Sequence, residues 1–322
     1  QGLSRYLLNH EKSPSVCIAY DSRNMSKEFA DIVSKVLAGN GIKVYLYESL
    51  RPTPMLSFAV RYMEASAGIM ITASHNPAEY NGYKVYGSDG AQIAGQAAEE
   101  TLEYIEACDI FKDVKTITIE EAKAQGKLIY IGEDVDNAYY EKVSSLIIRQ
   151  DLVKEKASEL SIIYTPIHGS GNIPVRTILK RLGFNNVAVV PEQELPDGNF
   201  PTAPYPNPES KQVFELAIEL AKQTSPDLIF GTDPDCDRIG VVVRAEDGEY
   251  KVLTGNQVGA LLTEYVLSAR DEMGILSSKD TVIKTIVTSQ MANAICKSYN
   301  AQSMDVLTGF KFIGEQIGLL EK

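Results

Sequence analysis

Three aspartates alternate in one short loop of the sequence, where Asp233, Asp235 and Asp237 lie between two apolar segments. Carboxylates this close repel one another, so they converge on one point only when a cation holds them. Hard oxygen ligands of this kind suit Mg²⁺ or Ca²⁺. An EF-hand loop begins similarly, but here Arg238 replaces its glycine and Arg244 replaces its final glutamate. We therefore predict a Mg²⁺ site at the three aspartates, with a solvated acidic turn as the alternative.

A second polar motif surrounds Ser74, which follows an apolar segment at 68–72. The G-x-S-x-G elbow of serine hydrolases is absent, and His75, as the immediate neighbour, is expected to be poorly placed as a base. Such a serine can instead carry a phosphoryl group, which adds up to about two negative charges and three acceptor oxygens. Three carboxylates from one loop leave Mg²⁺ in need of a further ligand, which phospho-Ser74 could supply. For Ser74 alone, the alternative is an ordinary turn.

Two basic residues could serve the same chemistry. Lys84 follows the turn-forming pair Asn81-Gly82 and could fold back over Ser74 as a general acid/base, provided that its surroundings lower its pKa. The alternative is a solvated lysine. Arg23 follows the first apolar segment and is a candidate phosphate contact; a surface ion pair is the alternative.

The elements that must position these residues repeat along the chain. Short β-rich segments alternate with amphipathic helical patterns, which indicates α/β units with largely parallel sheets. In such sheets ligands bind beyond the carboxyl ends of the strands, and both polar motifs fall at such ends. The expected strands are 15–20, 43–47, 68–72, 160–164, 187–190, 227–230, 281–287 and 304–307.

Composition limits the partners. The chain has 322 residues, enough for two or three domains. Its net charge of −12 argues against nucleic acid and anionic membranes as partners, because both bind basic patches.

The four cysteines form no CxxC pair and are expected to be reduced thiols, so we predict a cytoplasmic protein. There is no apolar run of membrane-spanning length. The sequence leaves the oligomeric state open.

Three motifs together resemble a known family, the α-D-phosphohexomutases. Residues 72–77 (TASHNP), followed by YNGYK at 80–84, resemble the family's phosphoserine loop. Residues 231–238 (GTDPDCDR) are similar to its metal-binding loop. Residues 308–314 (TGFKFIG) resemble the third-domain segment of the long phosphoglucomutase and phosphopentomutase branch.

The resemblance implies a reversible transfer of phosphate between O1 and O6 of α-D-glucose phosphate. Phosphorylated Ser74 would give its phosphoryl group to the sugar, form glucose 1,6-bisphosphate, and take back the other phosphate. The resemblance further implies that the three aspartates hold Mg²⁺ and that Lys84 is the general acid/base. It also implies that Arg23 and Arg238 contact the active-site phosphoryl group and that His75 positions this group. The implied contacts to the phosphosugar are Lys284, Thr308, Gly309 and Lys311.

The resemblance also implies four domains around a cleft. We expect three-layer α/β domains with mixed, largely parallel sheets: a phosphoserine-loop domain at 1–137, a metal-loop domain at 138–252 and the start of a sugar-binding domain at 253–322. Both ends read like interrupted helices, so we expect a truncated chain without the fourth, phosphate-binding domain. The segments that select the sugar would then lie outside it.

Alternatives remain open within and beyond the family. Phosphopentomutase or phosphomannomutase would use the same chemistry on another sugar. A catalytically silent relative would bind a sugar phosphate without turning it over. A Mg²⁺-dependent phosphatase would use an aspartate, rather than Ser74, as the nucleophile.

Overall fold

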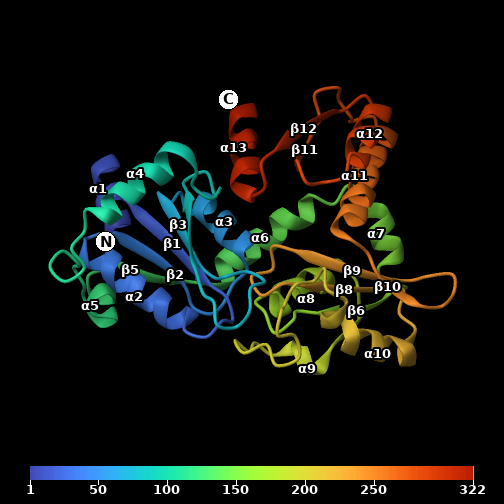
Figure 1. The fold of residues 1–322 in the computed structure, drawn as a ribbon, viewed down its shortest axis with the longest axis horizontal. Coiled ribbons are helices and arrows are strands. Elements are labelled where there is room, and N and C mark those ends of the chain that lie inside the picture. The colour runs from blue at the N-terminus through green and yellow to red at the C-terminus, as the bar shows by residue number, and fades with distance from the viewer. Residues whose placement is uncertain (322) are drawn as a thin grey trace.

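A five-stranded sheet with helices on both faces forms the first unit of the computed structural model, which describes residues 1–321 (Figure 1). Its strands are β1 (Ser15–Tyr20), β2 (Lys43–Tyr47), β3 (Ala67–Ile71), β4 (Tyr83–Gly87) and β5 (Leu128–Ile131). Its helices are α1 (Gly2–His10), α2 (Ser26–Gly39), α3 (Thr53–Tyr62), α4 (Gly95–Glu106), α5 (Ile119–Ala124) and α6 (Glu133–Ser145). The strand order is β4-β3-β1-β2-β5, and only β4 is antiparallel to its neighbour.

The central strand β1 explains the three layers. Val16 and Ile18 pack into a core on one face of the sheet, whereas Cys17 and Ala19 pack into a second core on the other. Successive side chains of a strand point to opposite faces, so a strand covered on both sides is apolar throughout. This accounts for the continuous apolar segment at 15–20.

The second unit repeats this plan. Its strands are β6 (Ser161–Thr165), β7 (Asn186–Val189), β8 (Leu228–Thr232), β9 (Ile239–Arg244) and β10 (Tyr250–Val252), in the order β10-β9-β8-β6-β7. Its helices are α7 (Gln150–Lys156), α8 (Asn172–Arg181), α9 (Pro191–Glu194), the 3₁₀ turn η1 (Lys211–Phe214) and α10 (Glu215–Thr224). Two separate hydrophobic clusters again lie on the two faces of the sheet. The predicted α/β fold with mixed, largely parallel sheets is confirmed.

The third unit comprises α11 (Gly255–Glu272), β11 (Thr281–Thr285), α12 (Met291–Ser298), β12 (Gln302–Val306) and α13 (Phe310–Leu320). β11 and β12 pair in parallel. Figure 1 shows α13 standing between the first unit and this small sheet. Gly314 of α13 approaches Ala91 so closely that an added Cβ would lie 2.7 Å from the Ala91 Cβ.

The two complete units place their motifs equivalently. The order β4-β3-β1-β2 in the first corresponds strand for strand to β9-β8-β6-β7 in the second. The serine loop joins β3 to β4, and the aspartate loop joins β8 to β9. Both loops therefore leave the carboxyl end of a central strand and return along an antiparallel neighbour, the position at which α/β sheets bind ligands.

The predicted domain boundary at residues 137 and 138 falls inside a helix. Residues 133–138 form the first turns of α6, whose Val135 packs against α3 and the first sheet. The assignment of domains stays a prediction at this junction. None of the helices within residues 1–321 combines the length and apolar character that crossing a membrane requires.

Candidate active site

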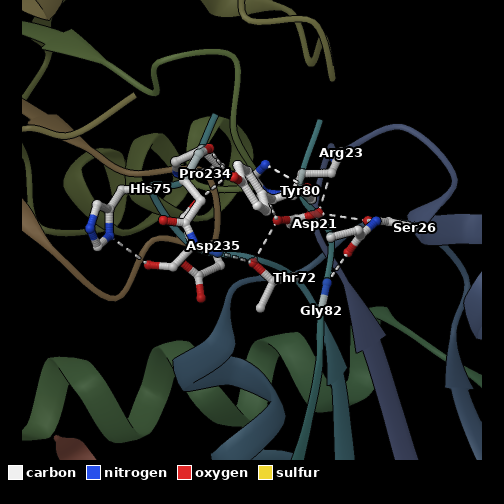
Figure 2. Close-up of polar contacts among 12 residues, drawn as sticks. Asp21, Arg23, Ser26, Thr72, His75, Tyr80, Gly82, Pro234 and Asp235 are labelled. Atoms are coloured by element: carbon white, nitrogen blue, oxygen red, sulfur yellow. Dashed lines mark hydrogen bonds and ion pairs between the residues drawn. The ribbon is translucent and has the colours of Figure 1, made fainter. Parts of the chain in front are cut away.

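Ser74 occupies a tight turn directly after β3. Its backbone φ is +54°, in the left-handed region that few non-glycine residues adopt. The Ser74 N–H donates to Thr72 Oγ1 at 2.8 Å, and the Thr72 hydroxyl donates to Asp21 Oδ2 at 2.6 Å. In Figure 2 Asp21 lies among Arg23, Ser26 and Thr72, with His75 on the far side of the loop. The serine is therefore held by a network rooted in β1.

The turn brings Ser74 to the aspartate loop of the second unit. Ser74 Oγ donates to Asp233 Oδ2 at 2.9 Å and lies 3.2 Å from His75 Nδ1. Because the hydroxyl has one proton, His75 Nδ1–H is the donor in the second bond. Burial, and then the charge of Arg238, lower the pKa of His75. His75 thus contacts the Ser74 hydroxyl directly. As a donor to that oxygen it would not act as its base, in keeping with the expectation from the sequence.

The aspartate loop gathers three carboxylates. Ligand oxygens from Asp233, Asp235 and Asp237 lie within 4.8 Å of one another. Asp233 Oδ1 accepts the backbone N–H groups of Asp237 at 3.1 Å and Arg238 at 3.0 Å. Asp235 Oδ2 accepts Lys84 Nζ at 3.1 Å and Thr53 Oγ1 at 2.9 Å. Asp235 Oδ1 and Asp237 Oδ1 are buried and have no hydrogen-bond partner among residues 1–321.

The charges of this cluster are compensated only in part. Burial, followed by the charge of Asp235, raises the pKa of Asp233 well above its usual range and the pKa of Asp237 to about 6. Burial would also raise the pKa of Asp235. The charge of Lys84 and the hydrogen bonds that the Asp235 carboxylate accepts instead hold that pKa below its usual range. A site with two buried carboxylate oxygens that accept no hydrogen bond from the described residues, and with excess negative charge, fits a hard divalent cation such as Mg²⁺.

A cleft of about 540 Å³ opens over these groups. Ser74, His75, Lys84, Asp237 and Arg238 line its floor. Its walls come from the start of α3, the loop after β4 and one face of α13, including Arg61, Gln92 and Phe310. The cleft therefore joins Asp237 of the aspartate cluster, a serine and the basic side chains of Lys84, Arg238 and Arg61 in a space the size of a small-molecule site.

Comparison with known proteins agrees with this geometry. Residues 1–109, 137–248 and 254–320 match alpha/beta/alpha domains I, II and III of phosphoglucomutase/phosphomannomutase. A Staphylococcus saprophyticus protein named phosphoglucomutase is 38% identical over 316 residues, which cover 98% of this chain and 56% of the relative.

The chain belongs to the phosphoglucomutase/phosphomannomutase family.

Another relative and a solved structure extend the comparison. A Staphylococcus aureus (strain N315) phosphoglucomutase is 39% identical over 321 residues, 99% of this chain and 56% of its own length. The chain thus spans just over half the length of these relatives. A structure named as a putative phosphomannomutase from Thermus thermophilus has the same fold, with a TM-score of 0.80, 24% identity, and coverage of 99% of this chain and 66% of its own.

The guanidinium of Arg23 contacts the backbone of the serine loop, and its predicted phosphate contact stays a prediction. Its side chain is fully buried, and the guanidinium donates to the carbonyl oxygens of Pro77 at 2.8 Å, Tyr80 at 2.9 Å and Ser74 at 2.7 Å, as well as to Asn76. With its donors directed at the loop backbone, Arg23 braces the serine loop (Figure 2). Direct phosphate contact would require breaking these bonds.

Replacing Arg23 by lysine is expected to destabilise this family member by about 3 kcal/mol, since one ammonium cannot satisfy the loop carbonyls and buried acceptors are left unpaired. Urea unfolding measures the loss, and limited proteolysis should cut between residues 73 and 82. Arg238→Lys is the matched control, because the Arg238 side chain is 46% exposed, and it should shift stability by less than about 0.5 kcal/mol. Equal effects would show that Arg23 does not brace the loop.

The two other basic residues face the cleft. Lys84 lies on β4 opposite Met70, with its ammonium on Asp235, and its side chain is 24% exposed. Arg238 Nε lies 3.9 Å from Asp237 Oδ1, and the guanidinium reaches solvent. Arg238 and the exposed Arg61 are thus the arginines of the cleft lining. The phosphate contact of Arg238 and the acid/base role of Lys84 stay predictions.

The four residues implied as phosphosugar contacts lie outside the cleft lining. Lys284 is buried and paired with Asp305 Oδ1 at 2.8 Å, on the neighbouring strand. Lys311 lines a second cavity beside α1 and α4. Thr308 and Gly309 precede α13, which presents Phe310 and Ile313 to the cleft instead. Their predicted contacts to the phosphosugar therefore stay predictions.

Sequence reasoning missed a supporting loop at residues 165–171. Ser170 donates to the Pro234 carbonyl through both its N–H and its hydroxyl, each at 2.8 Å. An added Cβ at Gly169 would lie 2.6 Å from Pro234 Cα, so only glycine permits this approach. The available signal was the position of TPIHGSG at the end of a strand, equivalent to the position of Ser22 and Arg23 after β1.

Proposed function

We propose that the protein containing this chain is a Mg²⁺-dependent phosphoglucomutase that transfers phosphate between O1 and O6 of α-D-glucose phosphate. One observation carries the proposal: Ser74 Oγ and Asp233 Oδ2 lie 2.9 Å apart although 159 residues separate them. A nucleophilic serine against an acidic cation site suits phosphoryl transfer, in which positioning and charge neutralisation do most of the work. The relatives named phosphoglucomutase support the choice of sugar.

In the proposed cycle a sugar hydroxyl attacks the phosphorus of phospho-Ser74. The new O–P bond forms, the bond to Ser74 Oγ breaks, and glucose 1,6-bisphosphate results. Lys84 gives a proton to the departing serine oxygen and recovers one from the attacking hydroxyl. Arg238 balances charge on the phosphoryl group. When bound by Asp233, Asp235 and Asp237, Mg²⁺ would neutralise charge on the transferring group. Reversing these steps with the other phosphate restores phospho-Ser74.

The direct test is turnover by protein expressed from the complete gene. With Mg²⁺ and catalytic glucose 1,6-bisphosphate, glucose 1-phosphate should convert to glucose 6-phosphate, followed by a coupled dehydrogenase assay. Mannose 1-phosphate and ribose 1-phosphate serve as parallel substrates for the phosphomannomutase and phosphopentomutase alternatives. Faster turnover of either would reassign the sugar. Release of inorganic phosphate without isomerisation would indicate a phosphatase.

Lys84→Met is expected to lower kcat by about 10²- to 10⁴-fold, the usual contribution of a general acid/base. The informative control is Lys84→Arg, which keeps the positive charge beside Asp235 but cannot exchange a proton near neutral pH. Steady-state kinetics should show both variants impaired. Recovery of activity in the arginine variant would mean that Lys84 supplies only charge.

A further inference from the structure

Thr53 makes two hydrogen bonds to one residue of the aspartate loop. Its N–H donates to the Asp235 carbonyl oxygen at 2.9 Å, and its Oγ1 donates to Asp235 Oδ2 at 2.9 Å. The two residues are 182 positions apart and belong to different units. Thr53 itself is 7% exposed, so both bonds are shielded from water.

The position of Thr53 in the chain explains its reach. It is the first residue of α3, between Pro52 and Pro54. The first N–H groups of a helix have no partner within the helix, so the Thr53 N–H is free to bond outside it. The positive end of the α3 dipole thereby points at an anionic loop, which is a favourable arrangement.

The two oxygens of Asp235 have different surroundings. Oδ2 accepts hydrogen bonds from Thr53 Oγ1 and Lys84 Nζ, whereas Oδ1 is buried and has no hydrogen-bond partner in the described part of the chain. The Thr53 hydroxyl therefore fixes the carboxylate so that Oδ1 is the oxygen left for a ligand. Without it, the flexible Lys84 side chain is the remaining donor to Oδ2 among residues 1–321.

We propose that Thr53 is a positioning residue that orients Asp235 for divalent-cation binding and ties the cation site to α3 of the first unit. The inference rests on the proposed function, in which the three aspartates hold Mg²⁺. Such outer contacts orient metal ligands, and their loss costs about 10- to 100-fold in metal affinity.

Removing the hydroxyl should leave the loop itself in place. Ser170 holds the Pro234 carbonyl from the opposite side through two bonds, and the backbone bond from Thr53 remains in any side-chain variant. The effect of a Thr53 substitution should therefore fall on the Asp235 carboxylate and on Tyr86, whose side chain also hydrogen-bonds Thr53. This separates a positioning role from a general loss of structure.

The test measures Mn²⁺ affinity by electron paramagnetic resonance on protein expressed from the complete gene. Thr53→Val, which replaces the hydroxyl by a methyl group, should bind Mn²⁺ about 10- to 100-fold more weakly. Thr53→Ser should restore near-wild-type affinity. Ser57→Ala is the matched control, because Ser57 lies one turn further along α3 and donates to the Gly90 carbonyl instead. Thr53→Ala provides a second hydroxyl-free variant should the valine variant fail to fold.

The outcomes separate the positioning role of Thr53 from the existence of the cation site itself. Weak binding by the valine or alanine variant, with recovery in serine, supports the inference. Wild-type affinity in a hydroxyl-free variant, or equally weak binding in the serine variant, overturns it while leaving the cation site intact. Absence of Mn²⁺ binding in the folded wild-type protein would overturn the cation site and this inference together.

Discussion

Ser74→Ala is expected to reduce mutase turnover by at least about 10⁴-fold, the scale of losing an enzyme's nucleophile. The change removes only the hydroxyl that donates to Asp233. It adds no strain, because alanine and serine have the same Cβ and therefore the same cost at the left-handed backbone of residue 74. Steady-state assays with glucose 1-phosphate, glucose 1,6-bisphosphate and Mg²⁺ measure the effect.

The matched control for this prediction is Ser57→Ala. Ser57 lines the same cleft, but its hydroxyl donates to the Gly90 carbonyl at 2.6 Å rather than to the aspartate loop. Its turnover should stay within a few-fold of the wild type. If Ser74→Ala retained phosphate release, an aspartate nucleophile and hence a phosphatase would be the better account.

Asp237→Asn is expected to weaken Mg²⁺ binding by at least about 100-fold, more than the loss of an outer contact, because it removes a charged ligand. Turnover at ordinary Mg²⁺ concentrations should fall in parallel. In EDTA, where no cation is bound, the same substitution is expected to stabilise the protein. Burial of repelling carboxylates costs free energy without a cation, so the variant should melt at a higher temperature than the wild type.

Calorimetry separates these two effects. Titration with Mg²⁺ gives the affinity, and thermal unfolding in EDTA gives the stability of the metal-free protein. Asp247→Asn is the control, because Asp247 follows β9 in an exposed turn where its carboxylate pairs with Lys251 at 2.8 Å. It should change neither quantity appreciably. Unchanged Mg²⁺ affinity in Asp237→Asn would remove Asp237 from the cation site.

Much of the fold could be predicted from local pattern. The segment at 15–20 is apolar on both faces because two cores cover β1, and the parallel order follows from the helices between strands. The convergence of Ser74 and Asp233 could also be anticipated, since both follow the carboxyl ends of central strands. The comparison with relatives confirms the family that these motifs indicated.

Long-range contacts account for what could not be predicted. Nothing near Arg23 in the sequence shows that its guanidinium turns toward the carbonyls of residues 74–80. The pairing of Lys284 with Asp305 depends on strand register, which local sequence does not give. The bonds from Thr53 to Asp235 join residues in different units. Such contacts depend on how the units pack, so a motif alone identifies the chemistry but not its supports.

The central claim is that Ser74 carries the phosphoryl group, and phosphopeptide mapping tests it most directly. Protein expressed from the complete gene would be incubated with glucose 1,6-bisphosphate and Mg²⁺, then examined by intact mass and peptide mass spectrometry. We expect one added phosphoryl group, mapped to Ser74 and absent from Ser74→Ala. A folded, metal-loaded protein without phosphoserine would contradict the mutase mechanism and favour a silent sugar-phosphate-binding relative.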